Sequence, residues 1–279
     1  MRFYAETLGL PRGAEALLCD LIHERTGLFF DTGKQDLLID KLAPLVVERG
    51  FNSFLDYYYW LKYDAGAEQE WGQVMDALSV QETYFWREID QVTALVEILM
   101  PELIARFGQK GVRIWSAPCA TGEEPLTIAM ALNEAGWFDR AQIEIYGSDA
   151  SRGAIEKAQQ GFYRPRSFRN LSPALRDKYF QAEDGGWRVK PDLHARIQWR
   201  VTNLINHDEA RRMAAVPVIF CRNVFIYFSA EMVRRTVRLF AELIPRSGYL
   251  CVGSSESLLK LTDDFELQEI GGAFIYVRK

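Results

Sequence analysis

The chain is poor in the residues that build metal sites and disulfide frameworks. Its 279 residues include four cysteines and three histidines, all widely scattered: Cys19, Cys119, Cys221, Cys251, His23, His194 and His207. Because no C-x-x-C pair occurs, the spacing favours neither a disulfide framework nor a zinc site, and we expect no metal. No apolar run approaches the ~20 residues needed to cross a bilayer. The N-terminus, Met1 to Glu6, lacks the apolar core of a signal peptide, so we expect a cytoplasmic protein.

Two phosphate-binding motifs are also missing. Neither G-x-G-x-x-G nor G-x-x-x-x-G-K-S/T occurs in residues 112–130, which disfavours NAD and ATP as ligands of this segment. The segment instead contains an apolar strand from Val112 to Ser116, a turn of small residues ending at Gly122, and an amphipathic helix. Small residues allow the backbone to approach a ligand closely. This pattern predicts a nucleotide-cofactor site that does not bind a pyrophosphate.

Two glutamates, Glu123 and Glu124, stand where this helix begins. Helix N-termini attract anions, so carboxylates at this place indicate a ligand that is cationic or rich in hydroxyl groups. S-adenosylmethionine has both properties. A second expected strand ends in Asp149, about as far downstream as a βαβ unit places a ribose-binding carboxylate. The spacing leaves two readings of Asp149 open: a ribose ligand, or a cap of the helix that starts near Ser151.

The first part of the chain has the periodicity of a helical domain. Apolar stripes predict helices over residues 14–25, 34–49 and 71–78, with one more beginning at Ser53. Pro44 lies inside the second helix and should kink or interrupt it. The aromatic run from Tyr57 to Trp60 is interpreted as domain core and its rim rather than as a ligand site.

After residue 90, expected strands and helices alternate, which predicts a mostly parallel sheet covered on both faces. The strands are expected near residues 112–116, 143–148, 217–222 and 248–253, followed by a hairpin of 265–270 and 273–278. Residues 161–203 break the alternation. Their short β-like runs, 187–190 and 197–201, are both assigned to a small β insertion.

Four separated motifs then follow one another along the chain. They are Thr83–Glu88 (TYFWRE), Arg113–Pro125 (RIWSAPCATGEEP), Gly147–Asp149 with the helix after it, and Ile219–Phe228 (IFCRNVFIYF). Together they resemble the CheR family of chemoreceptor glutamate methyltransferases. The resemblance implies an all-α N-terminal domain, residues 1–80, and a Rossmann-like class I methyltransferase domain of α/β fold, residues 81–279. The methyltransferase domain would carry the small antiparallel β insertion at about 161–203.

The resemblance also implies a set of contacts to S-adenosylmethionine, with S-adenosylhomocysteine as the product. Around the first motif these are Gln81, Thr83 and Arg87, and the family usually has asparagine where this chain has Gln81. Glu124 would face the cofactor's amino group, with a simple helix-opening charge as the alternative reading. Asp149 would take the ribose hydroxyls.

Further cofactor contacts are implied at Asn203 and Leu204, around the adenine, and at Asn223 and Val224. The last two follow an apolar strand, and ligands of open α/β sheets bind at such carboxyl ends. A turn-forming role is the alternative for Asn223. Pro118, where the family usually has a smaller residue, either stiffens the first loop or removes one cofactor contact, because proline lacks an N–H.

The implied reaction is methyl transfer to a glutamate carboxylate of a chemoreceptor. A glutamate with a pKa of about 4.3 is already ionised at neutral pH, so orientation and exclusion of water should suffice for catalysis. Arg87 and Tyr227 are the expected catalytic residues. Arg87 can pair bidentately with a carboxylate, and a structural salt bridge and a core tyrosine are the respective alternatives. Two other functions stay open: a methyltransferase for small molecules and a cofactor-binding regulator without activity.

The mode of receptor binding is harder to derive. The formal net charge is −5, and the expected helix 34–49 is poorer in cations than its counterpart in the family. A dense cluster of Arg164, Arg166 and Arg169 predicts a solvated face. Family members that grip a receptor's C-terminal pentapeptide carry a longer loop than the one between Phe180 and Trp187. We therefore expect a monomer that binds receptor helices without that tether and contacts neither nucleic acid nor the membrane interior.

Overall fold

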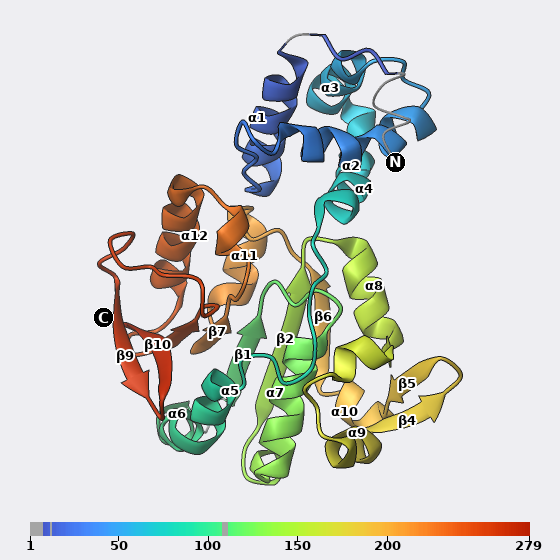
Figure 1. Ribbon diagram of the computed structural model, residues 1–279. Helices are drawn as coiled ribbons and strands as arrows, with labels where there is room; N and C mark the ends of the chain where they lie inside the picture. Colours follow the sequence, from blue (N-terminus) through green and yellow to red (C-terminus); the bar gives the residue numbers. More distant parts are fainter. Residues whose placement is uncertain (1–7, 12, 108–110) are drawn as a thin grey trace.

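The computed structural model describes residues 8–11, 13–107 and 111–279. Met1 to Glu6, where we expected no signal peptide, lie outside this range. Within the described residues, no helix is long and apolar enough to cross a membrane. Figure 1 shows a group of helices placed at one end of a larger unit built around a twisted sheet.

The N-terminal helices match the expected pattern. They are α1 (Ala14–Thr26), α2 (Gln35–Glu48), α3 (Phe54–Tyr63), the 3₁₀ turn η1 (Ala65–Gln69) and α4 (Glu70–Leu78). Gly27 ends α1 in the left-handed conformation, and the hydroxyl of Ser53 accepts the first free N–H groups of α3. Of the two expected effects of Pro44, a kink or an interruption, the interruption is wrong, because α2 continues through Pro44 to Glu48. Its buried leucine and valine side chains on both sides of Pro44 hold the helix together despite the missing N–H.

A buried carboxylate organises the core of these helices. Glu70 is 1% exposed and accepts hydrogen bonds from the Tyr57 hydroxyl at 3.0 Å and from Arg49 Nε at 2.7 Å. Burial, together with this carboxylate, holds the pKa of Tyr57 well above its usual value. Tyr57 and Tyr58 are buried while Tyr59 is half exposed, so the interpretation of the aromatic run as core and rim is confirmed.

The larger unit contains a seven-stranded sheet in the order β6-β2-β1-β7-β8-β10-β9. Its strands are β1 (Val112–Ser116), β2 (Ile143–Asp149), β6 (Ile197–Val201), β7 (Val218–Phe220), β8 (Tyr249–Cys251), β9 (Phe265–Ile270) and β10 (Ala273–Arg278). The first five run parallel, and the closing hairpin inserts β10 antiparallel to β8. The predicted α/β class and the terminal hairpin are confirmed.

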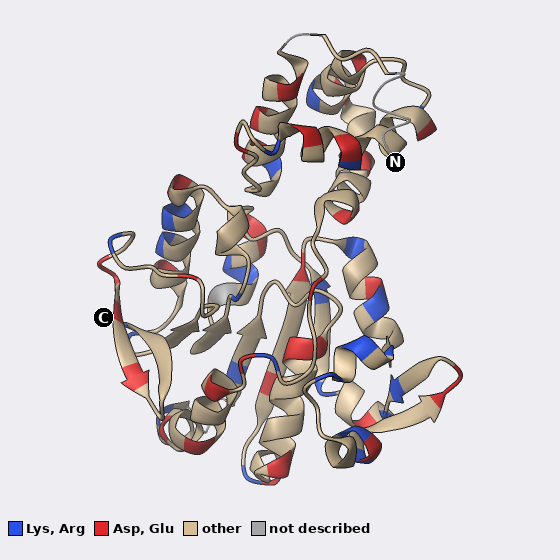
Figure 2. Ribbon diagram, viewed as in Figure 1, with Lys and Arg blue, Asp and Glu red and all other residues tan. Residues whose placement is uncertain are grey.

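Helices cover both faces of this sheet. They are α5 (Asp90–Ala94), the π-helical turn η2 (Leu95–Leu99), α6 (Met100–Phe107), α7 (Glu123–Glu134), η4 (Trp137–Asp139), α8 (Arg152–Gln160), α11 (His207–Ala214), η6 (Phe225–Tyr227) and α12 (Ala230–Leu243). Side chains alternate along β1, so Ile114 packs on the side of α7 and Trp115 on the side of α12. Figure 2 shows both signs of charge on the outer helices.

The small antiparallel sheet exists, but one of its expected strands belongs elsewhere. It consists of β3 (Phe162–Tyr163), β5 (Gly186–Val189) and β4 (Phe180–Glu183), with η5 (Pro165–Phe168), α9 (Pro173–Tyr179) and α10 (Pro191–His194) around them. Ile197–Val201, assigned to the insertion from the sequence, is instead β6 and pairs parallel with β2. The insertion therefore ends before residue 197, and the expected boundary at 203 is wrong.

Trp199 explains why β6 lies in the main sheet. Its indole packs where a Cβ on Gly122 or on Gly147 would come within 2.7 Å of the ring. Gly122 also has a φ of 96°, a conformation that favours glycine. Trp199 thus fills the space left by two glycines, one in β2 and one at the start of α7, and it connects β6 to the loop after β1.

The N-terminal helices sit over the carboxyl ends of the parallel strands (Figure 1). Asp76 of α4 accepts hydrogen bonds from Ser151 Oγ at 2.6 Å and from the Gly153 N–H at 3.0 Å, at the beginning of α8. On the other side, the Phe29 N–H donates to the Tyr227 carbonyl at 2.8 Å. The two parts of the chain are therefore joined on both sides of the edge at which ligands of such sheets bind.

Candidate active site

Two adjoining cavities lie at the carboxyl ends of the parallel strands. They enclose about 590 and 640 Å³, including space open to solvent, and share Val80, Pro118, Ala120, Asp149 and Asn223 as lining residues. Volumes of this size are usual for small-molecule sites. The cavities bring together every predicted site residue: Gln81, Thr83, Arg87, Glu124, Asp149, Asn203, Leu204, Asn223, Val224 and Tyr227.

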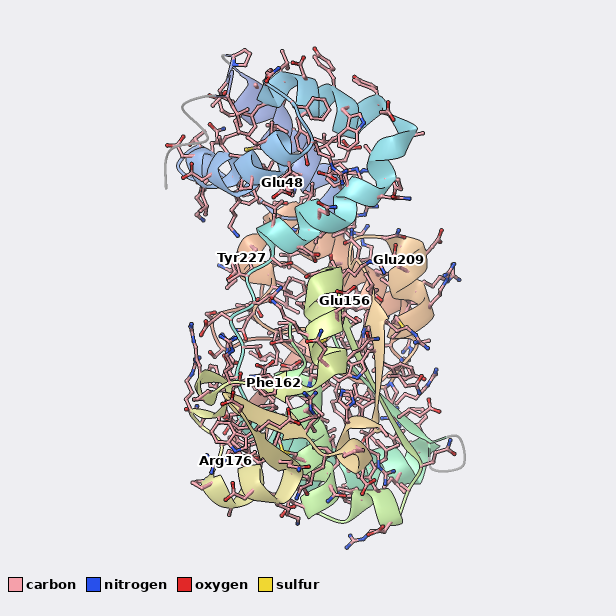
Figure 3. All side chains as sticks on the ribbon, turned by 90° about the vertical axis from the view of Figure 1, so that its right-hand side faces the viewer. Glu48, Glu156, Phe162, Arg176, Glu209 and Tyr227 are labelled. Atoms are coloured by element: carbon pink, nitrogen blue, oxygen red, sulfur yellow. The ribbon has the colours of Figure 1, made fainter. Side chains whose placement is uncertain are left out.

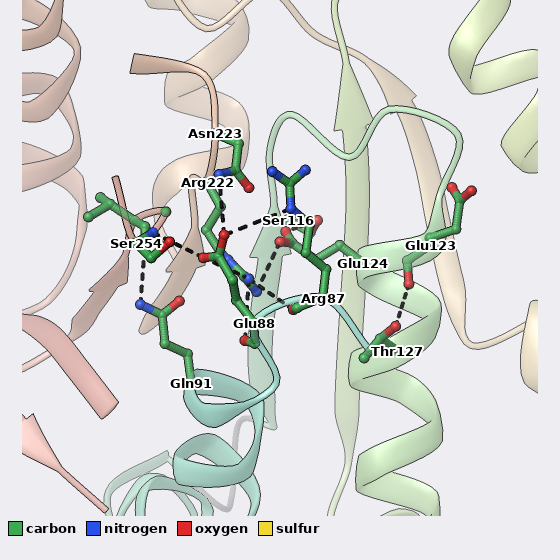
Figure 4. A network of polar contacts seen from close by, with 12 residues as sticks. Arg87, Glu88, Gln91, Ser116, Glu123, Glu124, Thr127, Arg222, Asn223 and Ser254 are labelled. Atoms are coloured by element: carbon green, nitrogen blue, oxygen red, sulfur yellow. Dashed lines mark hydrogen bonds and ion pairs between the residues drawn. The ribbon is translucent and has the colours of Figure 1, made fainter. Parts of the chain in front are cut away.

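A buried arginine that the sequence reasoning passed over holds one side of the first cavity. The Arg222 side chain is only 2% exposed, with Nη1 3.4 Å from Glu124 Oε2 and Nη2 3.2 Å from Glu88 Oε2. Nη2 also donates to the Arg87 carbonyl at 2.9 Å (Figure 4). An arginine at the end of the apolar run 218–221 was the available signal, because a charge in that position is buried and needs partners.

Glu124 directs its carboxylate toward the strand ends. Ser116 Oγ donates to Oε1 at 2.7 Å, while Oε2 faces Arg222. Burial raises the pKa of Glu124, although Arg222 and Ser116 oppose that rise. Its neighbour Glu123 is 2% exposed, lines neither cavity, and accepts from Thr121 Oγ1 and Ser167 Oγ at 2.6 and 2.9 Å. The two glutamates at the helix start therefore have different surroundings.

Asp149 lines both cavities at the end of β2 and is 8% exposed. Its two oxygens accept from the backbone N–H groups of Ala120 and Ser151, each at 2.9 Å. Burial raises the pKa of Asp149 to about 6, although these two N–H groups favour the ionised form. The N-cap of α8 is Ser151, whose hydroxyl accepts from the Ala154 N–H. Asp149 therefore orders the two loops beside the cavities and is not the helix cap.

The motif loop before α5 contributes Thr83 and Arg87 to the first cavity. Arg87 Nη1 donates to the Glu82 carbonyl at 2.8 Å, while Nε lies 3.8 Å from Glu88 Oε1. The ion pair between Arg87 and Glu88 is thus long, and other N–H donors of the Arg87 guanidinium remain available to a ligand. For Glu88, burial raises the pKa, but Arg222 and the Ser254 N–H outweigh it, so the net shift is downward.

The second cavity is the more apolar. Leu204 and Val224 are buried and supply apolar surface. The Asn203 amide is already engaged, since Nδ2 donates to the Arg25 carbonyl at 2.9 Å and Oδ1 accepts from the Ile205 N–H at 3.2 Å. Asn203 therefore connects the cavity wall to α1.

Asn223 takes a turn conformation with φ of 59°, so its turn-forming role is real. Glu256, which the sequence reasoning missed, holds that turn by accepting from the N–H groups of Asn223 and Phe225 at 2.8 and 2.7 Å. Asn223 still lines both cavities. Glu256 lies 33 positions from Asn223 in the sequence, so no local pattern indicates that it holds this turn.

The second cavity is also lined by Tyr227, Gln81 and Pro118. Tyr227 is 37% exposed, so it is not a core tyrosine, and Figure 3 places it at the junction of the two parts of the chain. Gln81 Oε1 accepts from Lys157 Nζ at 2.9 Å. Pro118 lines both cavities, at the end of a cis peptide bond from Ala117.

The arginine cluster at residues 164–169 is exposed, as predicted for a solvated face, and its charge is partly neutralised. Arg166 and Arg169 both form ion pairs with Glu82, and the Arg169 guanidinium stacks 3.6 Å from the centre of the Tyr84 ring. Among the described residues, no group of three or more histidine, cysteine, aspartate or glutamate side chains is placed to hold a metal ion.

The donor set of the cavities fits S-adenosylmethionine. Glu124 and Asp149 supply carboxylates that could accept a cationic group and vicinal hydroxyls, and the second cavity has apolar walls that could accept a heterocycle. Together with the sheet order, these features are those expected of a methyltransferase that uses S-adenosylmethionine. Residues 81–273 match the S-adenosylmethionine-binding domain of CheR methyltransferases, and residues 15–79 match the all-α domain of the same enzymes. The chain belongs to the CheR methyltransferase family.

Named relatives are similar over nearly the whole chain. Chemotaxis protein methyltransferase 2 of Vibrio cholerae is 35% identical over 252 residues, covering 89% of this chain and 87% of the relative. Chemotaxis protein methyltransferase 1 of Pseudomonas aeruginosa is 31% identical over 264 residues, covering 92% and 95%. The chemotaxis protein methyltransferase of Klebsiella aerogenes is 31% identical over 268 residues, covering 95% and 90%.

Replacing Arg222 tests the buried ion-pair cluster. Arg222→Met should lower the free energy of unfolding by about 3–5 kcal/mol, because two carboxylates lose their buried counter-charge. Without the cation the pKa of Glu124 rises further in the folded state, so the loss should be larger at pH 8 than at pH 5. Urea denaturation at both pH values measures it.

Arg169→Met is the matched control, because this arginine forms its ion pair at the surface. It should leave the free energy of unfolding nearly unchanged. An equal loss in both variants, or a loss in Arg222→Met that does not depend on pH, would contradict the buried cluster.

Proposed function

We propose that this protein transfers methyl groups from S-adenosylmethionine to glutamate side chains of a chemoreceptor. The supporting observation is the pair of joined cavities that gathers Arg87, Glu124 and Asp149, with Tyr227 at the outer edge. The names of the relatives point to the same receptor chemistry. No observation favours a small-molecule methyltransferase or an inactive regulator over this function.

We propose that substrate binding and catalysis belong to two domains that follow each other along the chain. Residues 1–80 would form a helical substrate-binding domain and residues 81–279 the catalytic domain, with a division close to Val80. Support comes from the separate apolar cores of the two parts. We also propose that the protein acts as a monomer. All four cysteines are free and buried, as in proteins of reducing compartments, and we propose the cytoplasm as its location.

We assign the cofactor contacts from the family resemblance and from the residues that line the two cavities. Glu124 would bind the amino group and Asp149 the ribose hydroxyls, while Leu204 and Val224 would contact the adenine. Asn203 and Asn223 would border the adenine, and Gln81, Thr83 and Arg87 would close the cavity from the motif loop. When bound, S-adenosylmethionine supplies a methyl group on a cationic sulfur. The protein needs to orient an acceptor that is already ionised, since a glutamate pKa is about 4.3.

Arg87 and Tyr227 are proposed to orient the acceptor. Arg87 retains guanidinium donors that can bind a carboxylate bidentately. Tyr227 places a phenol at the second cavity, where it can hold the acceptor and help to exclude water. Neither residue has to act as a base.

Asp149 can be tested by ligand binding. Asp149→Ala should weaken S-adenosylhomocysteine binding by ~1.5–3 kcal/mol, the usual worth of hydrogen bonds to a charged group. Since the pKa of Asp149 is about 6, wild-type affinity should also fall as the pH decreases through 6, and Asp149→Asn should lose this step. Titration calorimetry between pH 5 and 8 measures both effects. Unchanged affinity in Asp149→Ala would remove Asp149 from the site.

Methyl transfer itself tests the function and the roles of Tyr227 and Arg87. Wild-type protein should transfer label from S-adenosylmethionine to a purified chemoreceptor cytoplasmic fragment, as alkali-labile methyl esters. Tyr227→Phe should lower turnover and leave cofactor affinity nearly unchanged, whereas Arg87→Ala should impair both. Wild-type turnover in Tyr227→Phe would exclude a catalytic hydroxyl, and an absence of methyl esters with wild-type protein would refute the function.

We further propose that the receptor is bound without a C-terminal pentapeptide tether. The strands β4 and β5 are joined by only Asp184 and Gly185. Such a compact turn offers little surface beside the edge strand that would pair with a peptide. Calorimetry with synthetic receptor pentapeptides should detect no micromolar binding. Micromolar binding that is lost when residues 185–190 are mutated would contradict this proposal.

A further inference from the structure

A groove beside the active-site cavities is lined mainly by apolar side chains. It encloses about 620 Å³, including space open to solvent, between the first half of α2, the segment 28–30 and the turn η6. Five of the thirteen large apolar residues that are exposed in the described part of the chain line it: Phe29, Leu37, Val80, Ile226 and Tyr227. Contiguous exposed apolar surface of this kind marks an interaction site.

The groove opens directly onto the candidate active site. Leu28, Val80 and Tyr227 line both the groove and the second cavity. Its two walls are fixed to each other, because the Phe29 N–H donates to the Tyr227 carbonyl at 2.8 Å and Leu28 pairs antiparallel with Phe228. A partner in this groove therefore lies against a preformed surface next to the proposed site of methyl transfer.

The charged residues around the groove offer little to an acidic partner. Lys34 Nζ lies 3.8 Å from Asp31, and Lys41 Nζ donates to the carbonyls of Ala77 and Leu78 at 3.2 Å each. Lys41 is thus engaged within the protein, and Lys34 forms a long, solvent-exposed ion pair that Asp31 partly neutralises. The exposed charges of α2 near them, Asp36 and Asp40, are acidic. Figure 2 shows α2 as mostly red among its coloured segments. Recognition at this surface must therefore rest on apolar contacts.

We propose that the groove docks the receptor helix that carries the acceptor glutamate, by its apolar side chains. The choice of a receptor helix as the occupant rests on the proposed function. Residues one turn apart on a helix are about 5.4 Å apart along its axis and share a face, so apolar residues next to the glutamate can enter the groove while the glutamate reaches the cavity. Helix-in-groove recognition uses anchors with this spacing. Binding of this kind depends little on salt, whereas docking by charge weakens as salt is added.

Leu37→Asp tests the groove, and Val47→Asp is its matched control. Both residues belong to α2 and are exposed to a similar extent, 50% and 40%, but only Leu37 lines the groove. Losing one buried leucine contact corresponds to roughly a tenfold change in a binding constant. Leu37→Asp should therefore raise both the KM for a receptor cytoplasmic fragment and its Kd about tenfold. Cofactor affinity and kcat should stay at wild-type values. Fluorescence anisotropy of a labelled fragment gives Kd without cofactor.

A second measurement uses salt. Wild-type Kd should change less than about threefold between 50 and 500 mM NaCl, because charge attraction contributes little. A steep rise in Kd with salt, or a wild-type Kd for Leu37→Asp, would overturn the groove proposal while leaving the proposed function intact. If the wild-type protein methylates no receptor fragment, the proposed function and the occupant both fail. Self-association of the wild type that Leu37→Asp abolishes would show that a second copy of the chain covers the groove.

Discussion

One buried cation connects the parts of the site that lie far apart in the sequence. Arg222 at the end of β7 faces Glu88 of the motif loop and Glu124 of α7, at 3.2 and 3.4 Å. A buried guanidinium is tolerated only when carboxylates and carbonyls satisfy it. Three chain segments are therefore held around one charge (Figure 4). These contacts fix the wall of the first cavity. The position of Arg87 follows from this, because its carbonyl is one of the groups that Arg222 binds.

The same edge of the sheet is closed by the N-terminal helices. Asp76 binds the beginning of α8, and the backbone of Phe29 pairs with that of Tyr227. Figure 3 shows Tyr227 between the two parts. The helical part thereby contributes to the second cavity and forms most of the apolar groove. The region proposed to bind cofactor and the region proposed to bind the receptor helix meet at this tyrosine.

Short sequence patterns correctly predicted the strands and turns that depend on neighbouring residues alone. Val112–Ser116 and the terminal hairpin were expected within a residue, and the residues that the motifs predicted for the cofactor site do lie at one edge of the sheet. Ile197–Val201 was assigned to the wrong sheet, since a short β pattern does not reveal its partner and the pairing with β2 depends on Trp199 packing against distant glycines. Glu256 was missed because its role depends on contacts far along the chain, and Arg222 was missed although its place after an apolar run was a signal, because the run does not reveal the partners of the charge. Pro44 did not interrupt α2, because burial on both sides outweighs one missing hydrogen bond.

The most direct test of this account is a crystal structure of the protein with S-adenosylhomocysteine. The account predicts one ligand across the two joined cavities, with its amino group at Glu124, its ribose hydroxyls at Asp149, and its sulfur toward Arg87 and Tyr227. The Arg222 ion pairs should be unchanged. A ligand bound elsewhere, or bound in these cavities with its ribose away from Asp149 and its amino group away from Glu124, would contradict the account.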